Sequence, residues 1–262
     1  MDHATALAEF DRQMRRDPVP ERGAVVEREE RVTRMVSSAD GWSGVLWTDL
    51  TQADADAVID AQLSRFAGRN EPWEWKYYSH DQPADLPGRL RSAGFTPDTA
   101  EALLIAEIAD LDVDVPPPDG VELVPVTDAR GADMVVRVHD EVFGGCHVSV
   151  GSAIVAALES RPRPVEAVVA VADDTAVSAG RAEFPVRGDF ASLWGGGTLP
   201  RWRGRGVFRS LVAYRARLAR DRGYRYLQVD ATPDSRPILL RMGFAELATT
   251  VPFRYPGTGT PA

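Results

Sequence analysis

The chain has 262 residues, of which 44% are hydrophobic and 26% charged, as in an ordinary globular protein of two domains. A formal net charge of −9 argues against nucleic acid as a partner, because nucleic-acid binding favours a basic surface. No run approaches 18 apolar residues, so no membrane partner is expected. Cys146 is the single cysteine, which excludes an internal disulfide and fits a reducing, cytoplasmic location.

The N-terminal part alternates strand-like and helix-like patterns. Residues 42–48 and 72–79 are strand-like, and residues 52–66 show the apolar spacing of an amphipathic helix. Residues 83–93 predict a short helix that ends in Gly94-Phe95.

A proline-rich segment, residues 112–119 (DVDVPPPD), predicts an extended linker because consecutive prolines cannot sit inside a helix. We therefore divide the chain into domains at 1–111 and 120–256, with a disordered tail at 257–262.

The C-terminal part predicts a sheet with helices beside it. Strands are expected at 121–126, 165–172, 176–184, 190–199, 224–231 and 245–255. Helices are expected at 127–143, 149–159 with Ser149 as N-cap, 207–222 with Gly223 at its end, and 235–244.

A glycine–arginine turn, residues 201–206 (RWRGRG), joins the strand at 190–199 to the helix that begins at Val207. Glycines adopt positive φ and allow a ligand to approach the backbone, and the first N–H groups of a helix attract anions. The turn therefore predicts an anion site. It is not a P-loop, because Lys76 is the only lysine, and the dinucleotide fingerprint would need a small residue where Arg209 stands.

The turn resembles the diphosphate loop of the GNAT superfamily of acyl-CoA-dependent N-acetyltransferases. That loop reads Gln/Arg-x-x-Gly-x-Gly/Ala, which Arg201, Gly204 and Gly206 fill in order. The following strand (YRYLQVDA) and the short helix that ends in Gly243-Phe244 resemble the family's next elements. The resemblance implies a GNAT fold over roughly 120–256, a mixed and mostly antiparallel α/β sheet flanked by helices.

The N-terminal part repeats the same order of strand, helix, strand, short helix and Gly-Phe. The spacing from Trp47 to Gly94 is close to that from Leu199 to Gly243. No glycine–arginine turn follows its first strand. Residues 1–111 are therefore interpreted as a degenerate GNAT-like domain without the diphosphate loop, in a tandem of two such domains; an unrelated α/β domain is the alternative.

The resemblance implies acetyl-CoA as acyl donor and the transfer of its acetyl group to an amine. Loop N–H groups would bind the diphosphate, and amides near Thr198 and Leu199 would polarise the thioester carbonyl. Gly195, Gly196 and Gly197 would permit a bulge or a close ligand approach. The expected donor-binding residues are Thr198, Leu199, Arg201, Arg203, Gly204, Arg205, Gly206, Val207 and Phe208.

Catalytic acid–base groups are less well marked. Relatives often carry a glutamate where this chain has Ser192, and a tyrosine where it has Leu239. Glu183, on the preceding strand, is the candidate base, and Ser235 is the candidate proton donor. Other polar residues near the first helices, His139, Asp140, Glu141 and His147, and also Asp230, are interpreted as surface or turn groups.

No metal site is predicted, since the polar pairs lack ligand spacing. The favoured function is an N-acetyltransferase for a small-molecule amine, with a homodimer as an open option. The alternative is a non-catalytic acyl-CoA-binding sensor or scaffold module. A third option is a tandem transferase whose acceptor pocket includes Trp73, Trp75 and Tyr77.

Overall fold

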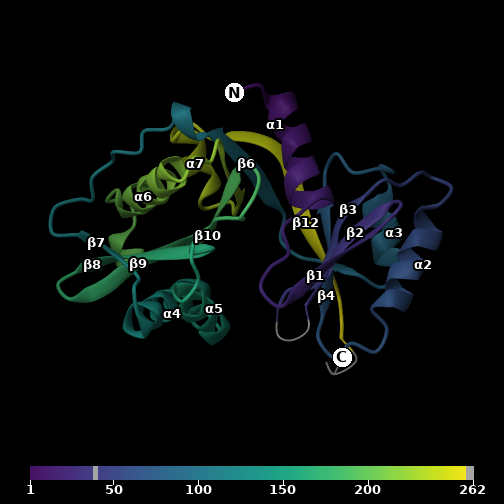
Figure 1. Ribbon diagram of the computed structural model, residues 1–262, viewed down its shortest axis with the longest axis horizontal. Coiled ribbons are helices and arrows are strands. Elements are labelled where there is room, and N and C mark those ends of the chain that lie inside the picture. The colour runs from purple at the N-terminus through teal and green to yellow at the C-terminus, as the bar shows by residue number, and fades with distance from the viewer. Residues whose placement is uncertain (38–40, 258–262) are drawn as a thin grey trace. The chain divides into compact units, whose positions relative to one another are not determined.

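The computed structural model describes residues 1–37 and 41–257, which fold into two compact units (Figure 1). The N-terminal unit contains residues 2–104 and 230–236 together with the segment that begins at Glu246. The C-terminal unit contains Met1, residues 105–229 and residues 237–245. The division differs from the contiguous one expected at 112–119, because the last strand of the chain pairs within the N-terminal unit. The predicted tail falls largely on 258–262, outside the described residues.

The N-terminal unit is built on a sheet with strand order β1-β2-β3-β4-β12, and β5 also pairs with β12. Its strands are β1 (Ala24–Glu29), β2 (Val32–Ser37), β3 (Gly44–Thr48), β4 (Trp73–Tyr78), β5 (Thr96–Pro97) and β12 (Ala245–Tyr255). Its helices are α1 (His3–Phe10), a π-helical turn (Asp11–Arg16), α2 (Ala55–Arg65) and α3 (Leu86–Ser92). The strand β6 (Glu101–Glu107) is divided between the units at Leu104.

The core of the N-terminal unit is aromatic. Trp73 stacks on Phe66 with ring centroids 4.2 Å apart and meets Phe95 edge-on at 5.0 Å. Tyr255 of β12 packs against both Trp73 and Phe95. Trp73 and Trp75 are buried in this core, so the expectation that they line an acceptor pocket is wrong for these two. Tyr77 is half-buried against the same core.

The C-terminal unit has the strand order β11-β10-β9-β8-β7, with the end of β6 beside β11. Its elements are a 3-10 turn (Ile108–Asp110), β7 (Glu122–Pro125), α4 (Ala129–Phe143), α5 (Val148–Leu158), β8 (Val165–Ala172), β9 (Thr175–Glu183), β10 (Phe190–Thr198), a 3-10 turn (Pro200–Trp202), α6 (Val207–Asp221), β11 (Tyr226–Ala231) and most of α7 (Arg236–Arg241). Strands β7 to β10 are antiparallel and β11 is parallel to β10. The predicted mixed, mostly antiparallel sheet is confirmed.

Helices cover both faces of this sheet, with α6 on one side and α4 and α5 on the other (Figure 1). Along β8, Ala167 and Val169 pack against α4, while Val168 and Ala170 pack against α6, as expected for alternating side chains of a strand. Helix α5 begins at Val148 with His147 as its N-cap residue, so the predicted cap at Ser149 is wrong.

Among residues 1–37 and 41–257, no helix has both the length and the apolar character needed to cross a bilayer.

Because β12 completes the core of the N-terminal unit, Phe253→Ala should lower the stability of that unit by about 4 kcal/mol. Phe253 is fully buried and meets Tyr77 edge-on at 6.1 Å. Four of the six tryptophans lie in residues 2–104, so tryptophan fluorescence during urea unfolding reports this unit. Val186→Ala, at an exposed site, is the matched control. Equal midpoints for the two variants would contradict this assignment of β12.

Candidate functional site

Strands β10 and β11 lie side by side over a short distance and then separate. Their parallel register covers only Phe190 to Ser192, paired with Tyr226 to Gln228, although both strands continue. At the last pair, Gln228 Nε2 donates to Ser192 Oγ at 2.8 Å. Gln228 is 4% exposed, and its Oε1 has no hydrogen-bond partner. An unpaired buried acceptor is costly, so this atom favours a ligand that donates a hydrogen bond there.

On its other edge, β10 loses register with β9 between Trp194 and Gly197, leaving Gly195 and Gly196 without partners in the register. We call these four residues the bulge. Gly195 has φ of +58°, and a Cβ there would lie 2.6 Å from His139 Cε1. Both the backbone conformation and the close ring therefore require glycine at this position.

The α6 side of the bulge is held by Arg215, which is 1% exposed. Its guanidinium donates to the carbonyl oxygens of Arg181 at 3.2 Å and Trp194 at 3.5 Å, and its Nε donates to Leu211 O at 3.0 Å. No carboxylate of the described residues lies within ion-pair distance of it. Burial, and then the neighbouring Arg181, lower the pKa of Arg215 to about 9.

The α4 side of the bulge is held by His139, which is buried. Its Nε2 donates to Gly195 O at 2.8 Å. Burial lowers the pKa of His139 to about 4, so the ring is neutral near pH 7 and carries its proton on Nε2. The bulge is therefore fixed from both faces of the sheet by side chains that bond its carbonyl groups.

The predicted glycine–arginine turn forms a tight loop before α6. Gly204 has φ of +73°, and Gly206, the N-cap residue, has φ of +91°. A Cβ at either position would meet no atom within 4 Å, so the backbone conformation is what requires glycine. The first turn of α6 has neither a side-chain cap nor an acidic residue. Its first N–H groups therefore have no side-chain cap, and the anion site expected there stays a prediction.

The two residues before the loop have partners already. Leu199 N donates to Val177 O at 2.9 Å, so this amide is not available to polarise a carbonyl, and that part of the prediction is wrong. Thr198 shares a 2.7 Å hydrogen bond between its hydroxyl and that of Ser178. The unpaired register positions of the bulge, Gly195 and Gly196, are better placed for this role.

The three arginines of the turn differ in their contacts. Arg203 Nε donates to Thr198 O at 3.1 Å and braces the end of β10. Arg205 lies over the Trp202 ring at 4.9 Å. Arg201 is exposed and lies 3.8 Å from Glu141, a surface pair that contributes little stability. Arg201 therefore differs from Arg203 and Arg205, because its contact is with an exposed carboxylate and not with a backbone carbonyl or an aromatic ring.

The remaining predicted donor-binding residues anchor the start of α6. Val207 is buried in the core between α6 and the sheet. Phe208 lies beside β10, since a Cβ on Gly196 would approach its ring to 3.0 Å. The loop is therefore fixed to the strand that carries the bulge.

Glu183 lies on the face of the sheet that α4 covers, because it is two residues from Arg181 and four from Ala179 along β9, and Ala179 packs against α4. Its register partner on β10 is Ser192, at the end of the β10–β11 pairing. Arg181 Nε donates to Glu183 Oε1 at 3.1 Å. Glu183 is thus near the expected place, but it is bound to a cation.

Two positions bear on the predicted proton donor, Ser235. Ser235 shares a 3.2 Å contact between its hydroxyl and that of Thr232, in the turn before α7, and belongs to the N-terminal unit. Leu239, where relatives carry a tyrosine, is 1% exposed and is a core residue.

Two large apolar side chains are exposed at the bulge, one of them from the bulge itself. Phe143, at the end of α4, is 51% exposed, and its ring would lie 3.0 Å from a Cβ on Gly197. Trp194 is partly exposed and Arg181 lies over its ring at 5.9 Å. Exposed aromatic groups at a strand with unpaired positions are typical of a ligand-binding surface.

A cavity of about 540 Å³ lies against α4, lined by Arg130, Arg137, Glu141 and Leu199 among others. Its lining includes none of the bulge residues.

The N-terminal unit contains a second pair of separating strands. Strands β3 and β4 are parallel only at Gly44 and Val45, paired with Glu74 and Trp75. Here a side chain occupies the space between them: Arg15 donates from Nε to Leu46 O of β3 at 3.0 Å and lies 4.2 Å over the Tyr78 ring of β4.

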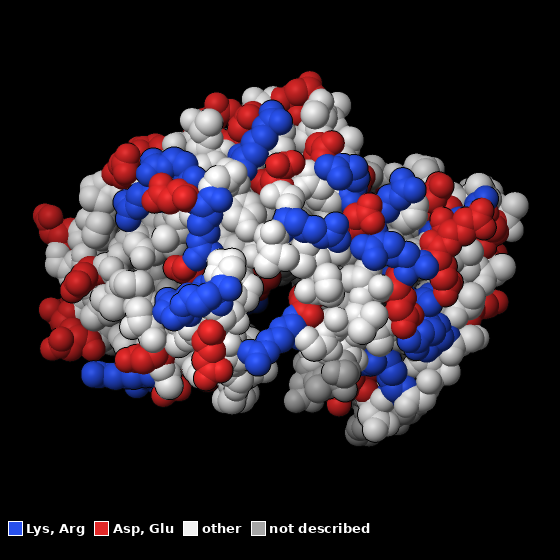
Figure 2. Space-filling view, viewed as in Figure 1, with Lys and Arg blue, Asp and Glu red and all other residues white. Residues whose placement is uncertain are grey.

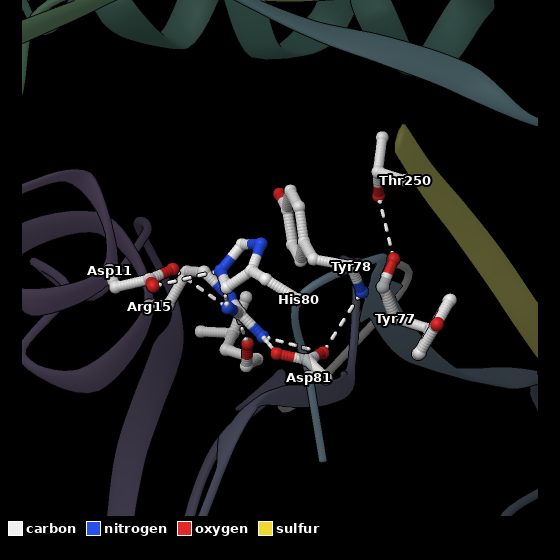
Figure 3. A network of polar contacts seen from close by, with 8 residues as sticks. Asp11, Arg15, Tyr77, Tyr78, His80, Asp81 and Thr250 are labelled. Carbon is white, nitrogen blue, oxygen red and sulfur yellow. Dashed lines mark hydrogen bonds and ion pairs between the residues drawn. The ribbon is translucent and has the colours of Figure 1, made fainter. Parts of the chain in front are cut away.

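Arg15 is bound by two carboxylates (Figure 3). It donates to both oxygens of Asp81, at 2.7 and 2.8 Å, and to Asp11 at 2.7 Å. His80 Nε2 lies 2.8 Å from Asp11. Asp81 also accepts from Tyr78 N at 2.9 Å. A buried ion pair, Arg15 with Asp81, therefore closes the space between β3 and β4.

The segment between β3 and α2 also differs from its C-terminal counterpart. It has no glycine, and it carries Asp49 and Asp54, with Asp56 in the first turn of α2. Asp54 Oδ1 accepts from Thr51 N at 2.7 Å. Carboxylates at a helix start repel phosphate, so this unit lacks the features of an anion cradle.

Within the described ranges, no group of three or more His, Cys, Asp or Glu side chains is arranged to hold a metal ion.

Comparisons with known proteins agree with this geometry. Residues 134–244 match the model of the acetyltransferase (GNAT) family. The sequence matches no curated protein. Among solved structures, a GCN5-related N-acetyltransferase from Kribbella flavida is 19% identical, with a TM-score of 0.69 over 97% of this chain and 94% of that one.

Two further structures align over nearly the whole chain. A tandem GNAT protein from the clavulanic acid biosynthesis pathway, without AcCoA, is 12% identical with a TM-score of 0.60, over 99% of this chain and 95% of that one. A functionally unknown conserved protein from Staphylococcus epidermidis is 13% identical with a TM-score of 0.65, over 94% of this chain and 97% of that one. Residues 134–244 thus match the GNAT acetyltransferase family, and the chain as a whole has a fold similar to that of a tandem GNAT protein.

The neutral, buried state of His139 predicts a pH-dependent stability. The unfolded chain takes up a proton near pH 6.5 and the folded protein only near pH 4, so the unfolded state binds more protons between these values. Stability should be full above pH 6.5 and fall by about 3 kcal/mol as the pH is lowered to 4. Urea unfolding across this range measures the slope. His139→Gln should remove it, and His3→Gln, at an exposed site, should keep it.

The ion pair in the N-terminal unit predicts a second stability effect. Arg15→Met leaves the buried Asp81 unpaired and should cost about 3–5 kcal/mol. The double variant Arg15→Met with Asp81→Asn should recover part of this loss because no buried charge remains. Tryptophan fluorescence during urea unfolding measures both. An unchanged midpoint for Arg15→Met would contradict the burial of this pair.

Proposed function

We propose that the protein transfers an acetyl group from acetyl-CoA to the amine of a small molecule. The observation that carries this proposal is that β10 joins three features in one GNAT domain: separation from β11, a fixed bulge, and a loop that ends at the bare N-terminus of α6. A donor that is anionic at one end and amide-bearing along its length fits this strand.

Acetyl-CoA fits the residues present. Loop N–H groups around Gly204 and Gly206 would hold its diphosphate, with Arg201 nearby as a further cation. Gln228 Oε1 is the unpaired acceptor that an amide N–H of the pantetheine arm would satisfy. The amides of Gly195 and Gly196 would polarise the thioester carbonyl.

The acceptor in this proposal is a small amine with an apolar body. Phe143 and Trp194 offer exposed aromatic surface at the bulge on the α4 face. Figure 2 shows Lys/Arg and Asp/Glu side chains intermixed over one face of the molecule, without a broad basic field that would favour nucleic acid.

A non-catalytic acyl-CoA-binding module is the second candidate. It is favoured by Ser192, which is bonded to Gln228, by Leu239 in the core, and by Glu183 bound to Arg181. None of these positions supplies a free acid or base.

Acetyl-CoA binding tests the proposed diphosphate site in the loop before α6. Replacing Gly204 and Gly206 by valine strains the backbone and should weaken binding by about 100-fold, because two charge-assisted hydrogen bonds would be lost. Gly120→Val is the matched control, since Gly120 also has positive φ (+76°) with no atom within 4 Å of its Cβ position. Isothermal titration should give one site per chain for the unmodified protein. Two sites would contradict the inference that the Arg15–Asp81 pair blocks binding in the N-terminal unit. Equal affinity of the glycine variants and the control would contradict diphosphate binding at Gly204 and Gly206.

Turnover separates the two functions. Release of free CoA thiol is followed with a panel of primary amines that differ in the size of their apolar group. Activity that rises with apolar size supports the transferase for such acceptors. Tight binding of acetyl-CoA without thiol release from any amine would instead favour the binding module.

A further inference from the structure

The loop between α4 and α5 brings a carboxylate and an imidazole together. Gly144 and Gly145 both have positive φ, 72° and 81°, and let the chain reverse after Phe143. Asp140 Oδ1 then accepts two hydrogen bonds from His147, from the backbone N and from ring Nδ1, each at 2.9 Å. One carboxylate oxygen thereby fixes both the position and the rotation of the His147 ring.

This bond sets the protonation pattern of the pair. A ring Nδ1–H that donates to a carboxylate leaves Nε2 with its lone pair, which is the form of histidine that accepts a proton. The hydrogen bond from His147 lowers the pKa of Asp140, so the carboxylate is charged near neutral pH. His147 is 26% exposed, so its ring is accessible to solvent and to a ligand.

The pair stands beside the bulge. The His147 ring meets the His139 ring edge-on, with centroids 5.5 Å apart, and His139 in turn bonds Gly195 O. Phe143, which covers Gly197, lies 6.1 Å from His147 between ring centroids. His147 is therefore one ring away from the strand positions assigned to the thioester, on the face that carries the exposed aromatic groups.

We propose that His147, oriented by Asp140, is the general base that deprotonates the acceptor amine. This proposal rests on the transferase function above. As the amine nitrogen forms its bond to the acetyl carbonyl carbon and the carbon–sulfur bond breaks, His147 Nε2 takes the proton from nitrogen. The electron pair of the broken bond leaves on the CoA sulfur, and the imidazolium returns its proton to that thiolate or to water.

The charges that face His147 are compatible with this role. From α4 they are Asp140, which accepts from the ring Nδ1, and His139, which is neutral. From β9 the nearest are Arg181 and Glu183, which pair with each other. The exposed Cys146 is the adjacent titratable residue on the loop itself.

The test compares two variants with two matched controls. His147→Gln and Asp140→Asn alter the pair, whereas His3→Gln and Asp133→Asn change an exposed histidine and an exposed carboxylate of α4. For each protein, kcat and kcat/KM are measured from pH 5 to 10 with the best amine of the panel, and acetyl-CoA affinity is measured by titration.

We expect His147→Gln to lower kcat by about 10²–10⁴-fold and to remove the acidic limb of the pH–rate profile. Acetyl-CoA affinity should be unchanged because the base does not hold the donor. Asp140→Asn should lower kcat by a smaller factor, because the amide no longer fixes the His147 ring as the carboxylate does. The two controls should match the unmodified protein.

The outcomes distinguish the two levels of the proposal. If the unmodified protein binds acetyl-CoA but acetylates no amine, the transferase function and this base both fall. If it is active and His147→Gln keeps its pH profile and kcat, only the base is overturned. A kcat loss in which the acidic limb stays in place would reduce the pair to a cap of α5, which also overturns it.

Discussion

Where β10 loses its register with β9, backbone carbonyl groups leave the ladder, and the protein bonds them with side chains from both faces. Arg215 reaches them from α6, and His139 reaches them from α4. Burial keeps the His139 ring neutral. The buried guanidinium of Arg215 donates its hydrogen bonds to backbone carbonyl oxygens. Gly195 cannot carry a side chain because the His139 ring lies where its Cβ would be. The loop, the start of α6 and the exposed aromatic surface are all positioned by this one break.

The two units share a backbone arrangement but differ in the side chains that lie where their parallel strands separate. In both, a parallel pair of strands separates after a few residues. In the N-terminal unit, Arg15 and Asp81 fill the separation, and aspartates replace the glycines of the loop. In the C-terminal unit, the strands separate next to the unpaired Gln228 Oε1. A charged, hydrogen-bonded plug is incompatible with a ligand arm at the same place, so the proposed function assigns donor binding to the C-terminal unit.

The sequence predicted most elements of the C-terminal unit and its loop, because glycines, proline and apolar periodicity are local signals. It did not indicate α1, β1, β2 or β6, and it divided the units contiguously, because β12 pairs with β4 at a sequence distance that no local pattern encodes. His147 and Asp140 were dismissed as surface groups. The two side chains meet because the chain reverses at Gly144 and Gly145. The seven-residue separation of Asp140 and His147 matches no known motif, so nothing in the sequence indicated the contact. Leu199 was misassigned because its bond to Val177 is also nonlocal.

The pairing of β12 with β4 has a consequence for synthesis of the chain. The ribosome delivers Trp73 and Trp75 long before Phe253, so the edge of β4 and its aromatic side chains lack their neighbour until residues 245–255 have been made. An exposed apolar strand edge is prone to pair with other chains. The N-terminal unit therefore closes only after β12 has been synthesised, and until then the free edge of β4 is open to pairing with other chains.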